Sequence, residues 1–298
     1  MTDRYAVIGN PISHSKSPLI HRMFAEQTGQ DISYEAIEAP LDGFAATIER
    51  LRREGYKGCN VTVPFKFEAF KLATQLSERA QSAQAVNTLK LDSDTILGDN
   101  TDGVGLVADI ERNLGISLQG KHVLLMGAGG AAYGVSLPLL EAGAALTIAN
   151  RTVDKADALA AALRQLRPQN AHEFDPKIHR MTGLLRAGSI QSCGYPDLQG
   201  KKFDIVINAT SASLPKVGGL FDIGSAPTLP VGIFAPNSLA YDMMYGGITF
   251  FLSSSKQLGA TYVADGLGML VEQAAEAFHI WRDVRPDTRP VLAKLRAA

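Results

Sequence analysis

The sequence is poor in cysteine and has almost no net charge. The first feature bears on the cellular compartment, and the second on whether the protein binds nucleic acid. Its only cysteines, Cys59 and Cys193, lie far apart and have no metal-ligand spacing. We therefore expect a reducing, cytoplasmic compartment. The 29 basic residues are balanced by 30 acidic residues, which gives a formal net charge of -1. Because nucleic-acid binding depends on a basic excess that neutralises phosphates, we do not expect nucleic acid among the partners.

Long apolar runs are also missing, with one exception. The N-terminus lacks the charged region and the apolar core of a signal peptide. Residues 123–140 carry no charge and approach the length of a membrane span. This run contains Gly127, Gly129, Gly130, Gly134 and Pro138, however. We interpret it as a strand, a glycine-rich turn and a buried helix, and we expect no membrane partner.

The 298 residues are enough for two compact domains. Strands alternate with helices in the pattern, which predicts an α/β fold with mainly parallel or mixed sheets. In the second half, the order is that of a Rossmann-type, doubly wound dinucleotide-binding domain. We expect strands at residues 4–9, 32–37, 58–63, 88–91, 95–97, 121–126, 145–149, 203–208, 239–242 and 261–263. We expect helices at residues 18–28, 42–55, 65–74, 77–84, 103–113, 130–142, 154–165 and 269–282.

Some local features are predicted from single residues. Ser17, followed by Pro18, is expected to cap the first helix, and Asp42 the second. Residues 167–200 are poorly periodic, and we interpret them as an insertion with one short helix near 181–186. His14 and His21 are expected to face solvent, whereas Phe278 and Trp281 are expected to pack in the core. His172, Glu173, Asp175 and His179 fit no standard metal-ligand pattern, so no metal site is predicted.

The strongest cofactor motif is Gly127-Ala128-Gly129-Gly130-Ala131-Ala132, which matches G-x-G-x-x-A. It follows an apolar strand and opens a helix of small residues, the context that a dinucleotide site requires. Gly127 allows a tight turn and Gly129 lets the backbone approach a pyrophosphate. The pyrophosphate is favoured at the helix N-terminus by free N–H groups and the helix dipole. The alternative is a glycine-rich turn without a ligand.

The end of the next strand favours NADP(H) over NAD(H). An NAD site usually has an acidic residue about 20 residues after the glycines, to bind the ribose hydroxyls. This chain has Asn150-Arg151-Thr152 there, followed by Lys155. Arg151 can pair bidentately with a 2′-phosphate that an acidic residue repels. The alternative is an exposed arginine at a helix start.

Polar residues gather at element ends in the first half of the chain. Ser15 and Ser17 precede a helix, which suits a carboxylate. Asn60 and Thr62 share one face at the end of a strand, where open α/β sheets bind ligands, and Lys66 follows them. Asn87-Thr88 and the run 99–103 complete the group. For any one of these, a turn or a helix cap is an adequate alternative.

The motifs occur in one order along nearly the whole chain. They are His14-Ser15-Lys16-Ser17-Pro18, Asn60-Val61-Thr62 with Pro64 and Lys66, Val86-Asn87-Thr88, Asn100-Thr101-Asp102-Gly103, the glycine turn, Asn150-Arg151-Thr152, Asn208-Ala209-Thr210-Ser211, Asp242-Met243-Met244-Tyr245, and Asp265-Gly266-Leu267-Gly268-Met269-Leu270-Val271 with Gln273. Together they resemble the shikimate dehydrogenase family.

That resemblance implies NADPH-dependent, reversible reduction of 3-dehydroshikimate to shikimate by a substrate-binding domain (1–105) and an NADP-binding Rossmann domain (106–268). The C-terminal helix (269–298) is expected to pack back on the first domain, and the active site to lie in the cleft between domains. Lys66 and Asp102 are the implied catalytic pair. The implied substrate ligands are Ser15, Ser17 and Tyr245 for the carboxylate, and Thr62, Asn87, Asp102 and Gln273 for the hydroxyls. The implied cofactor residues are Gly127, Ala128, Gly129, Gly130, Ala131, Asn150, Arg151, Thr152 and Lys155, with Met243, Gly266 and Met269 near the nicotinamide.

The sequence departs from the family pattern in a few places and leaves rival functions open. Gln84 stands where glycine is usual, Ala212 is atypical, and the segment after Tyr245 is about one residue short. An enzyme of the same fold acting on quinate or on an amino analogue of shikimate is one alternative. A non-catalytic NADP(H)-binding sensor is another, although the presence of both Lys66 and Asp102 argues against it. The protein is expected to be a monomer or a homodimer.

Overall fold

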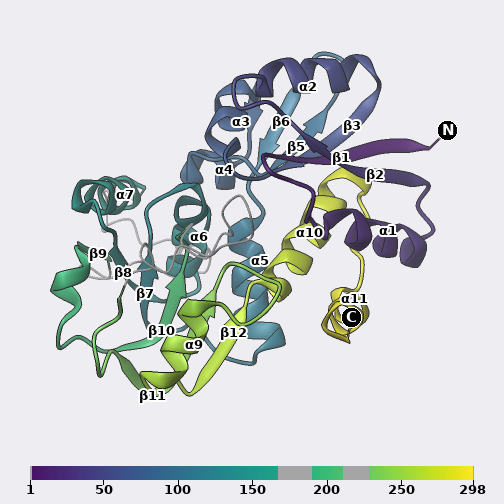
Figure 1. Cartoon of the computed structure of the whole chain (residues 1–298). Helices are drawn as coiled ribbons and strands as arrows, with labels where there is room; N and C mark the ends of the chain where they lie inside the picture. The colour runs from purple at the N-terminus through teal and green to yellow at the C-terminus, as the bar shows by residue number, and fades with distance from the viewer. Residues whose placement is uncertain (1, 167–189, 211–227, 298) are drawn as a thin grey trace, which may run out of the picture. The chain divides into compact units, whose positions relative to one another are not determined.

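A computed structural model describes residues 2–166, 190–210 and 228–297 and divides the chain into two compact units. Unit 1 is Met1–Ala108 with Gly268–Ala298, and unit 2 is Asp109–Leu267 (Figure 1). Both units have α/β structure, so the predicted fold class of two α/β domains is confirmed. Across these described ranges, no helix has the length and apolar character needed to cross a bilayer.

Unit 1 contains a mixed sheet of six strands in the order β2-β1-β3-β5-β6-β4. The first three strands in that order are parallel, whereas β5 runs antiparallel to both of its neighbours. The strands are β1 (Asp3–Gly9), β2 (Ile32–Glu38), β3 (Tyr56–Val61), β4 (Gln75–Leu76), β5 (Thr88–Leu91) and β6 (Ile96–Asp99). The helices are α1 (Ser17–Thr28), α2 (Phe44–Arg53), α3 (Lys66–Leu72), α4 (Glu78–Ala83), α5 (Asp102–Ala108), α10 (Leu267–Arg282) and α11 (Thr288–Ala297).

Helices cover both faces of this sheet. On one side lie α2 and α3, and on the other lie α1 and α10 (Figure 1). Phe44 and Phe65 stack under α2 and α3, with ring centroids 5.0 Å apart. On the opposite face Trp281 of α10 stacks on Tyr5 and donates its indole N–H to the carbonyl of Leu89 at 3.0 Å. Trp281 is therefore a packing residue, as predicted, and so is the fully buried Phe278.

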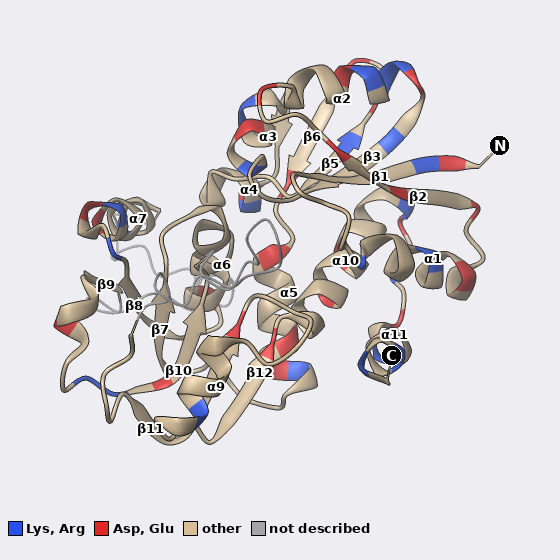
Figure 2. Ribbon diagram, viewed as in Figure 1, with Lys and Arg blue, Asp and Glu red and all other residues tan. Residues whose placement is uncertain are grey.

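Charged residues lie on the exposed faces of these helices. On α2 the charged residues are Glu49, Arg50, Arg52 and Arg53, with Glu54 at the C-cap, and both signs of charge are coloured on its ribbon (Figure 2). Arg50 pairs with Glu54, and Arg52 with Glu49, at the i,i+4 and i,i+3 spacings that place side chains beside one another. Such exposed pairs contribute little stability, so the apolar face of α2 holds the helix in place.

Unit 2 contains a second six-stranded sheet, in the order β12-β11-β10-β7-β8-β9, with every pair parallel. The strands are β7 (His122–Met126), β8 (Ala145–Ala149), β9 (Ile190–Cys193), β10 (Phe203–Asn208), β11 (Phe234–Asp242) and β12 (Tyr262–Asp265). The helices are α6 (Gly130–Glu141), α7 (Val153–Gln165) and α9 (Phe250–Gln257), with a π-helix at Asp109–Asn113 and a 3₁₀ turn at Tyr195–Leu198. The Rossmann-like prediction for this half is confirmed.

Several local predictions are wrong. Ser17 does not cap α1: it is the first helical residue, and the N-cap position is Lys16, whose side chain makes no capping hydrogen bond. Asp42 does not cap α2, whose N-cap position is Gly43. His21 does not face solvent, because its position on α1 turns it into the core, where it is fully buried.

Other differences concern element lengths. Part of the predicted insertion is the edge strand β9, and the C-terminal segment forms two helices, α10 and α11, instead of one. The expected short helix at 181–186, the set His172, Glu173, Asp175 and His179, and the atypical Ala212 lie outside the described residues.

Candidate functional site

The central pair of the candidate site in unit 1 is Lys66 and Asp102. Lys66 is the first residue of α3, and Asp102 is the first residue of α5. The Lys66 ammonium donates a hydrogen bond to Asp102 Oδ2. Only 15% of the Lys66 side chain and 7% of the Asp102 side chain are exposed. The pair is thus shielded from water. In such a site the attraction between opposite charges is stronger than at the protein surface.

Asn87 connects this pair to its surroundings. Its Nδ2 donates to Asp102 Oδ1 at 2.7 Å. Its Oδ1 accepts the backbone N–H of Thr101 at 2.8 Å and the hydroxyl of Thr88 at 2.9 Å. Because these donors fix which end of the amide faces Asp102, the carboxylate receives only N–H donors from Asn87 and Lys66.

Gln273 of α10 joins the same cluster. Its Oε1 accepts the Thr101 hydroxyl at 3.2 Å and lies 3.4 Å from Asn87 Nδ2, while its Nε2 donates to the carbonyl of Leu270 at 2.9 Å. A close approach of helices allows this, since a Cβ on Gly105 would lie 2.7 Å from Gln273 Cβ. Four of the residues singled out from sequence, Lys66, Asn87, Asp102 and Gln273, therefore form one contiguous group.

The two serines and Thr62 stand on neighbouring segments. Ser15 Oγ accepts the backbone N–H of Ser17 at 3.3 Å, so it supports the start of α1. Ser17 is buried, whereas Ser15 and Thr62 are partly exposed. Thr62 follows β3 directly, and its N–H donates to the carbonyl of Ile8 at 2.9 Å. Thr62 thus has the position at a strand end that the sequence predicted.

The glycine turn of unit 2 has the conformation expected of a phosphate-binding turn. Gly127 follows β7 with φ of 107°, a left-handed conformation that favours glycine. A Cβ on Gly127 would lie 3.1 Å from the backbone of Ala209, whereas a Cβ on Gly129 would meet no atom within 4 Å. Gly129 is the N-cap of α6, so there is room beside the first turn of a helix, whose first N–H groups have no intrahelical partners. Ala128 and Ala131 flank the turn and have small side chains.

Two basic residues, Arg151 and Lys155, follow the end of β8. Asn150 is held by its backbone N–H to Cys193 O at 3.2 Å and by its side chain to Thr152 O at 2.9 Å. Arg151, Thr152 and Lys155 are exposed. Among the described residues, neither the Arg151 guanidinium nor the Lys155 ammonium is part of a salt bridge. Both charged residues are exposed at the end of β8 and the start of α7.

The remaining predicted cofactor residues lie after β11 and β12 and in α10. The Met243 N–H donates to Asn208 O at 3.0 Å, and the Gly266 N–H donates to Met244 O at 2.9 Å. A Cβ on Gly266 would lie 2.3 Å from Met243 O, so these two segments can approach only at a glycine. Met243 and Gly266 belong to unit 2 and Met269 to unit 1. Tyr245, a predicted substrate residue, is a partly buried residue of unit 2.

Sequence reasoning missed several residues that support these groups. Arg79 pairs bidentately with Asp99, at 2.7 and 3.1 Å, and also with Glu276 of α10 at 2.9 Å. The Thr249 hydroxyl donates to the buried Asp242 at 2.6 Å. The Tyr34 hydroxyl donates to Asn60 at 2.8 Å. No local pattern signals these contacts, because each partner is remote in sequence or lies in a different motif.

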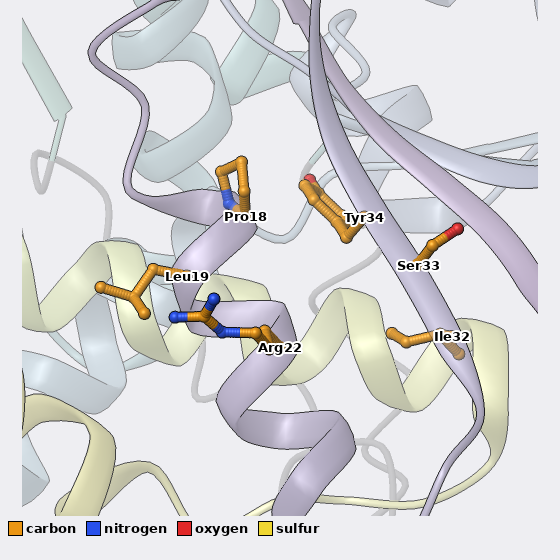
Figure 3. Close-up of a pocket in the computed structure, with 6 residues that line it drawn as sticks. All are labelled: Pro18, Leu19, Arg22, Ile32, Ser33 and Tyr34. Carbon is orange, nitrogen blue, oxygen red and sulfur yellow. The ribbon is translucent and has the colours of Figure 1, made fainter.

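A pocket of about 270 Å³ also opens in unit 1, between α1 and β2. Pro18, Leu19 and Arg22 line it from α1, and Ile32, Ser33 and Tyr34 from β2 (Figure 3). None of its lining residues belongs to the Lys66–Asp102 group.

Three family models match the chain. A shikimate dehydrogenase substrate-binding domain matches residues 7–89, a shikimate/quinate 5-dehydrogenase model matches residues 109–189, and a shikimate 5′-dehydrogenase C-terminal domain matches residues 266–296. Curated relatives match over the full length. The chain is 56% identical to the shikimate dehydrogenase (NADP(+)) of Nitrosospira multiformis, covering 100% of this chain and 98% of the relative. It is 57% identical to that of Aromatoleum aromaticum, covering 99% and 97%.

Solved structures agree. An Ael1 enzyme from Pseudomonas putida is 48% identical, with a TM-score of 0.81 over 99% of this chain and 98% of that one. Shikimate 5-dehydrogenase from Thermus thermophilus, in complex with NADP(H) and shikimate, is 30% identical, with a TM-score of 0.80 over 99% of both chains. The family models, the full-length relatives and the two α/β units together show that this chain belongs to the shikimate dehydrogenase family.

Proposed function

We propose that the protein is an NADP-dependent oxidoreductase that reversibly reduces the keto group of 3-dehydroshikimate to the hydroxyl of shikimate. The observation that carries this proposal is the shielded ion pair of Lys66 and Asp102, held by Asn87 and set beside Gln273. The names of the full-length relatives support the substrate and the cofactor. We further propose that unit 1 is the substrate domain and unit 2 the NADP domain.

The reaction needs a proton donor at the carbonyl oxygen. When bound, NADPH supplies the hydride, and negative charge then develops on the ketone oxygen. The protonated Lys66 donates a proton to that oxygen and stabilises its charge before the transfer is complete. Asp102 orients Lys66, because the ammonium donates a hydrogen bond to its carboxylate. In the reverse direction, the neutral amine accepts the hydroxyl proton.

The group around Lys66 is also suited to a polyhydroxylated ring. Thr62, Asn87, Asp102 and Gln273 offer both donors and acceptors, which a ring hydroxyl can satisfy in either sense. Ser15 and Ser17 offer hydroxyls near the start of α1 for the substrate carboxylate. The roles of these residues, and of Tyr245 in holding the carboxylate, are predictions from the family resemblance.

The features of unit 2 fit NADP(H). Gly127 supplies the turn, and Gly129 leaves open space beside the N-terminus of α6. A pyrophosphate bound there would accept hydrogen bonds from the free N–H groups of the first turn. Arg151 and Lys155 are exposed and form no salt bridge within the described residues, as a site for a 2′-phosphate requires. Ala128, Gly130, Ala131, Asn150 and Thr152 would complete the site, with Met243, Gly266 and Met269 toward the nicotinamide.

Two alternatives remain to be separated from this proposal. The first is an enzyme of the same fold that prefers quinate or an amino analogue of shikimate, and the presence of quinate in the description of one matching family model favours testing it. The second is a non-catalytic NADP(H) sensor. A retained Lys66–Asp102 pair argues for catalysis, since a sensor has no need of a proton donor beside a carboxylate.

One assay distinguishes these functions. The purified protein is given shikimate or quinate with NADP⁺ or NAD⁺, and reduced nicotinamide is followed at increasing concentrations of each. We expect the highest kcat/KM with shikimate and NADP⁺. A higher kcat/KM with quinate would show that quinate, and not shikimate, is the preferred substrate. Tight NADPH binding without turnover of 3-dehydroshikimate would favour the sensor.

The finer predictions about the cellular setting remain proposals. We propose a cytoplasmic location, supported by the free state of both cysteines, which are buried. We also propose a monomer or a homodimer, which light scattering at several concentrations would distinguish.

A further inference from the structure

A tyrosine on the edge strand of unit 1 is hydrogen-bonded into the interior. Tyr34 of β2 lies opposite the start of α1, with its ring against the helix (Figure 3). Its hydroxyl donates to Asn60 Oδ1 at 2.8 Å. Asn60 is the next-to-last residue of β3 and is only 5% exposed, so this hydroxyl is the donor that satisfies the amide oxygen in a water-poor setting.

The bond continues as a chain of donors that all point the same way. Asn60 Nδ2 donates to Thr88 Oγ1 at 3.1 Å, and the Thr88 hydroxyl donates to Asn87 Oδ1 at 2.9 Å. Asn87 Nδ2 then donates to Asp102 Oδ1 at 2.7 Å. Thr88 and Asn87 are 1% and 3% exposed, so water cannot replace a missing partner without rearrangement.

From this chain we infer that Tyr34 is a positioning residue for Asp102, acting through Asn60, Thr88 and Asn87. The inference rests on the proposed role of the Lys66–Asp102 pair. Donation by Tyr34 fixes the Asn60 amide with its NH₂ toward Thr88, which leaves the Thr88 proton free for Asn87. Aligned hydrogen bonds polarise one another, so the last bond, to the carboxylate, is strengthened.

Two contacts oppose the reversed orientation of the Asn60 amide, and donation by Tyr34 to its oxygen is one of them. Asn60 Nδ2 also lies 3.3 Å from the carbonyl oxygen of Asn87. A reversed amide would place oxygen against that carbonyl and would take the Thr88 proton away from Asn87. Thr101 N–H would still hold Asn87 Oδ1, so we expect loss of the Tyr34 hydroxyl to weaken the support of Asp102 and not to abolish it.

The titratable groups that face this chain do not account for a pH effect near neutrality. His21 of α1 stacks on the Tyr34 ring, with centroids 4.1 Å apart, and burial lowers the pKa of its imidazole to about 3, with a smaller opposing effect of Asn60. Burial also raises the pKa of the Cys59 thiol in β3 and that of Tyr34 itself. All three are neutral between pH 6 and 9, and Lys66 is the charged partner of Asp102.

The test is Tyr34→Phe, which removes one oxygen and keeps the ring. We expect kcat for shikimate oxidation to fall by about 3- to 10-fold, the loss of roughly one hydrogen bond. We expect KM for shikimate to change less than kcat, because the variant acts through the position of Asp102. The matched control is Tyr56→Phe, whose hydroxyl contacts Arg4 and Glu35 in the same sheet and has no link to Asp102.

A double-mutant cycle of Tyr34→Phe with Thr88→Val distinguishes an effect that passes through the hydrogen-bond chain from a general loss of protein stability. If Tyr34 acts through Thr88, the double variant is no slower than Thr88→Val alone. Additive losses in the cycle, or a Tyr34→Phe effect confined to KM or to thermal stability, would overturn the inference. Wild-type turnover of shikimate, measured in the same experiment, keeps this outcome distinct from failure of the proposed function.

Discussion

Asp102 receives one hydrogen bond at each carboxylate oxygen: Asn87 Nδ2 lies 2.7 Å from Oδ1, and the Lys66 ammonium donates to Oδ2. The two donors come from different segments, the loop before β5 and the start of α3. This arrangement holds the carboxylate from both sides, so it also fixes the position of the Lys66 ammonium.

Replacing Lys66 with methionine tests the proton donor. The variant keeps the length of the side chain but removes the acid, and a general acid contributes about 10²–10⁴-fold to rate. We expect kcat to fall within that range while the Kd for shikimate, measured by calorimetry, changes only a few-fold. Lys71→Met, an exposed lysine of the same helix, is the control and is expected to retain wild-type kcat. Near-normal turnover of the Lys66 variant would show that the proton comes from another group.

Arg151 is expected to select NADP over NAD. An Arg–phosphate contact is a charge-assisted hydrogen bond, worth about 1.5–3 kcal/mol. Arg151→Ala should therefore raise KM for NADP⁺ by about 10- to 100-fold and leave KM for NAD⁺ nearly unchanged, as steady-state kinetics with both cofactors would measure. Lys202→Ala removes another exposed charge of unit 2 and should alter neither constant. Equal losses for both cofactors would mean that Arg151 does not contact the 2′-phosphate.

Repetitive local patterns predicted the regular elements well. Alternating and continuous apolar runs located β8 and β10 at their observed bounds, and the glycine turn was placed correctly between β7 and α6. The caps were predicted poorly, because Ser and Asp before a helix are compatible with several local geometries. Ser15, and not Ser17, accepts the N–H at the start of α1. The edge strand β9 was missed because only four residues form it, after a stretch without periodicity.

Contacts between distant segments could not be predicted from one sequence. Tyr34 and Asn60 are 26 positions apart, and Arg79 and Glu276 are 197 apart, so no local spacing relates them. The prediction that His21 faces solvent is wrong, because α1 turns its ring into an aromatic group formed by Tyr34, Phe278 and Trp281. Gln84, at a position where the family usually has glycine, adopts φ of 48°, in the left-handed region that favours glycine.

Gly129→Ala tests whether the glycine turn holds a dinucleotide. A Cβ at this position meets no protein atom within 4 Å, so we expect thermal stability to be unchanged. If a pyrophosphate approaches the backbone there, the methyl group collides with it, and the Kd for NADPH should rise about 10-fold, or ~1.4 kcal/mol. Fluorescence titration with NADPH and a melting curve measure the two effects.

Gly127→Ala provides the contrast for that experiment. Its φ of 107° is strained for alanine, and the added Cβ would lie 3.1 Å from Ala209. This variant should lose stability as well as NADPH affinity. An unchanged NADPH affinity in Gly129→Ala would remove the glycine turn from the cofactor site, whatever the behaviour of Gly127→Ala.

His21 makes the stability of the protein depend on pH. Burial lowers the pKa of its imidazole to about 3, against 6.5 for an ordinary histidine. As pH falls below about 6.5 the unfolded chain takes up a proton that the folded chain does not. Stability is therefore lost progressively down to about pH 3, at up to roughly 1.4 kcal/mol per pH unit. By pH 5 this loss is about 2 kcal/mol.

His21→Phe should remove that loss, because phenylalanine fills the aromatic group without titrating. It also removes two buried ring nitrogens that have no hydrogen-bond partner among the described residues, so the variant should be at least as stable as wild type at pH 7.5. Urea unfolding at pH 7.5 and pH 5 measures both effects. Tyr34→Phe, which changes the stacking partner but keeps the imidazole, should retain the wild-type dependence on pH. If His21→Phe lost as much stability as wild type between these two pH values, the acid sensitivity would have to arise from other groups, and the imidazole would not be the buried neutral group that its surroundings indicate.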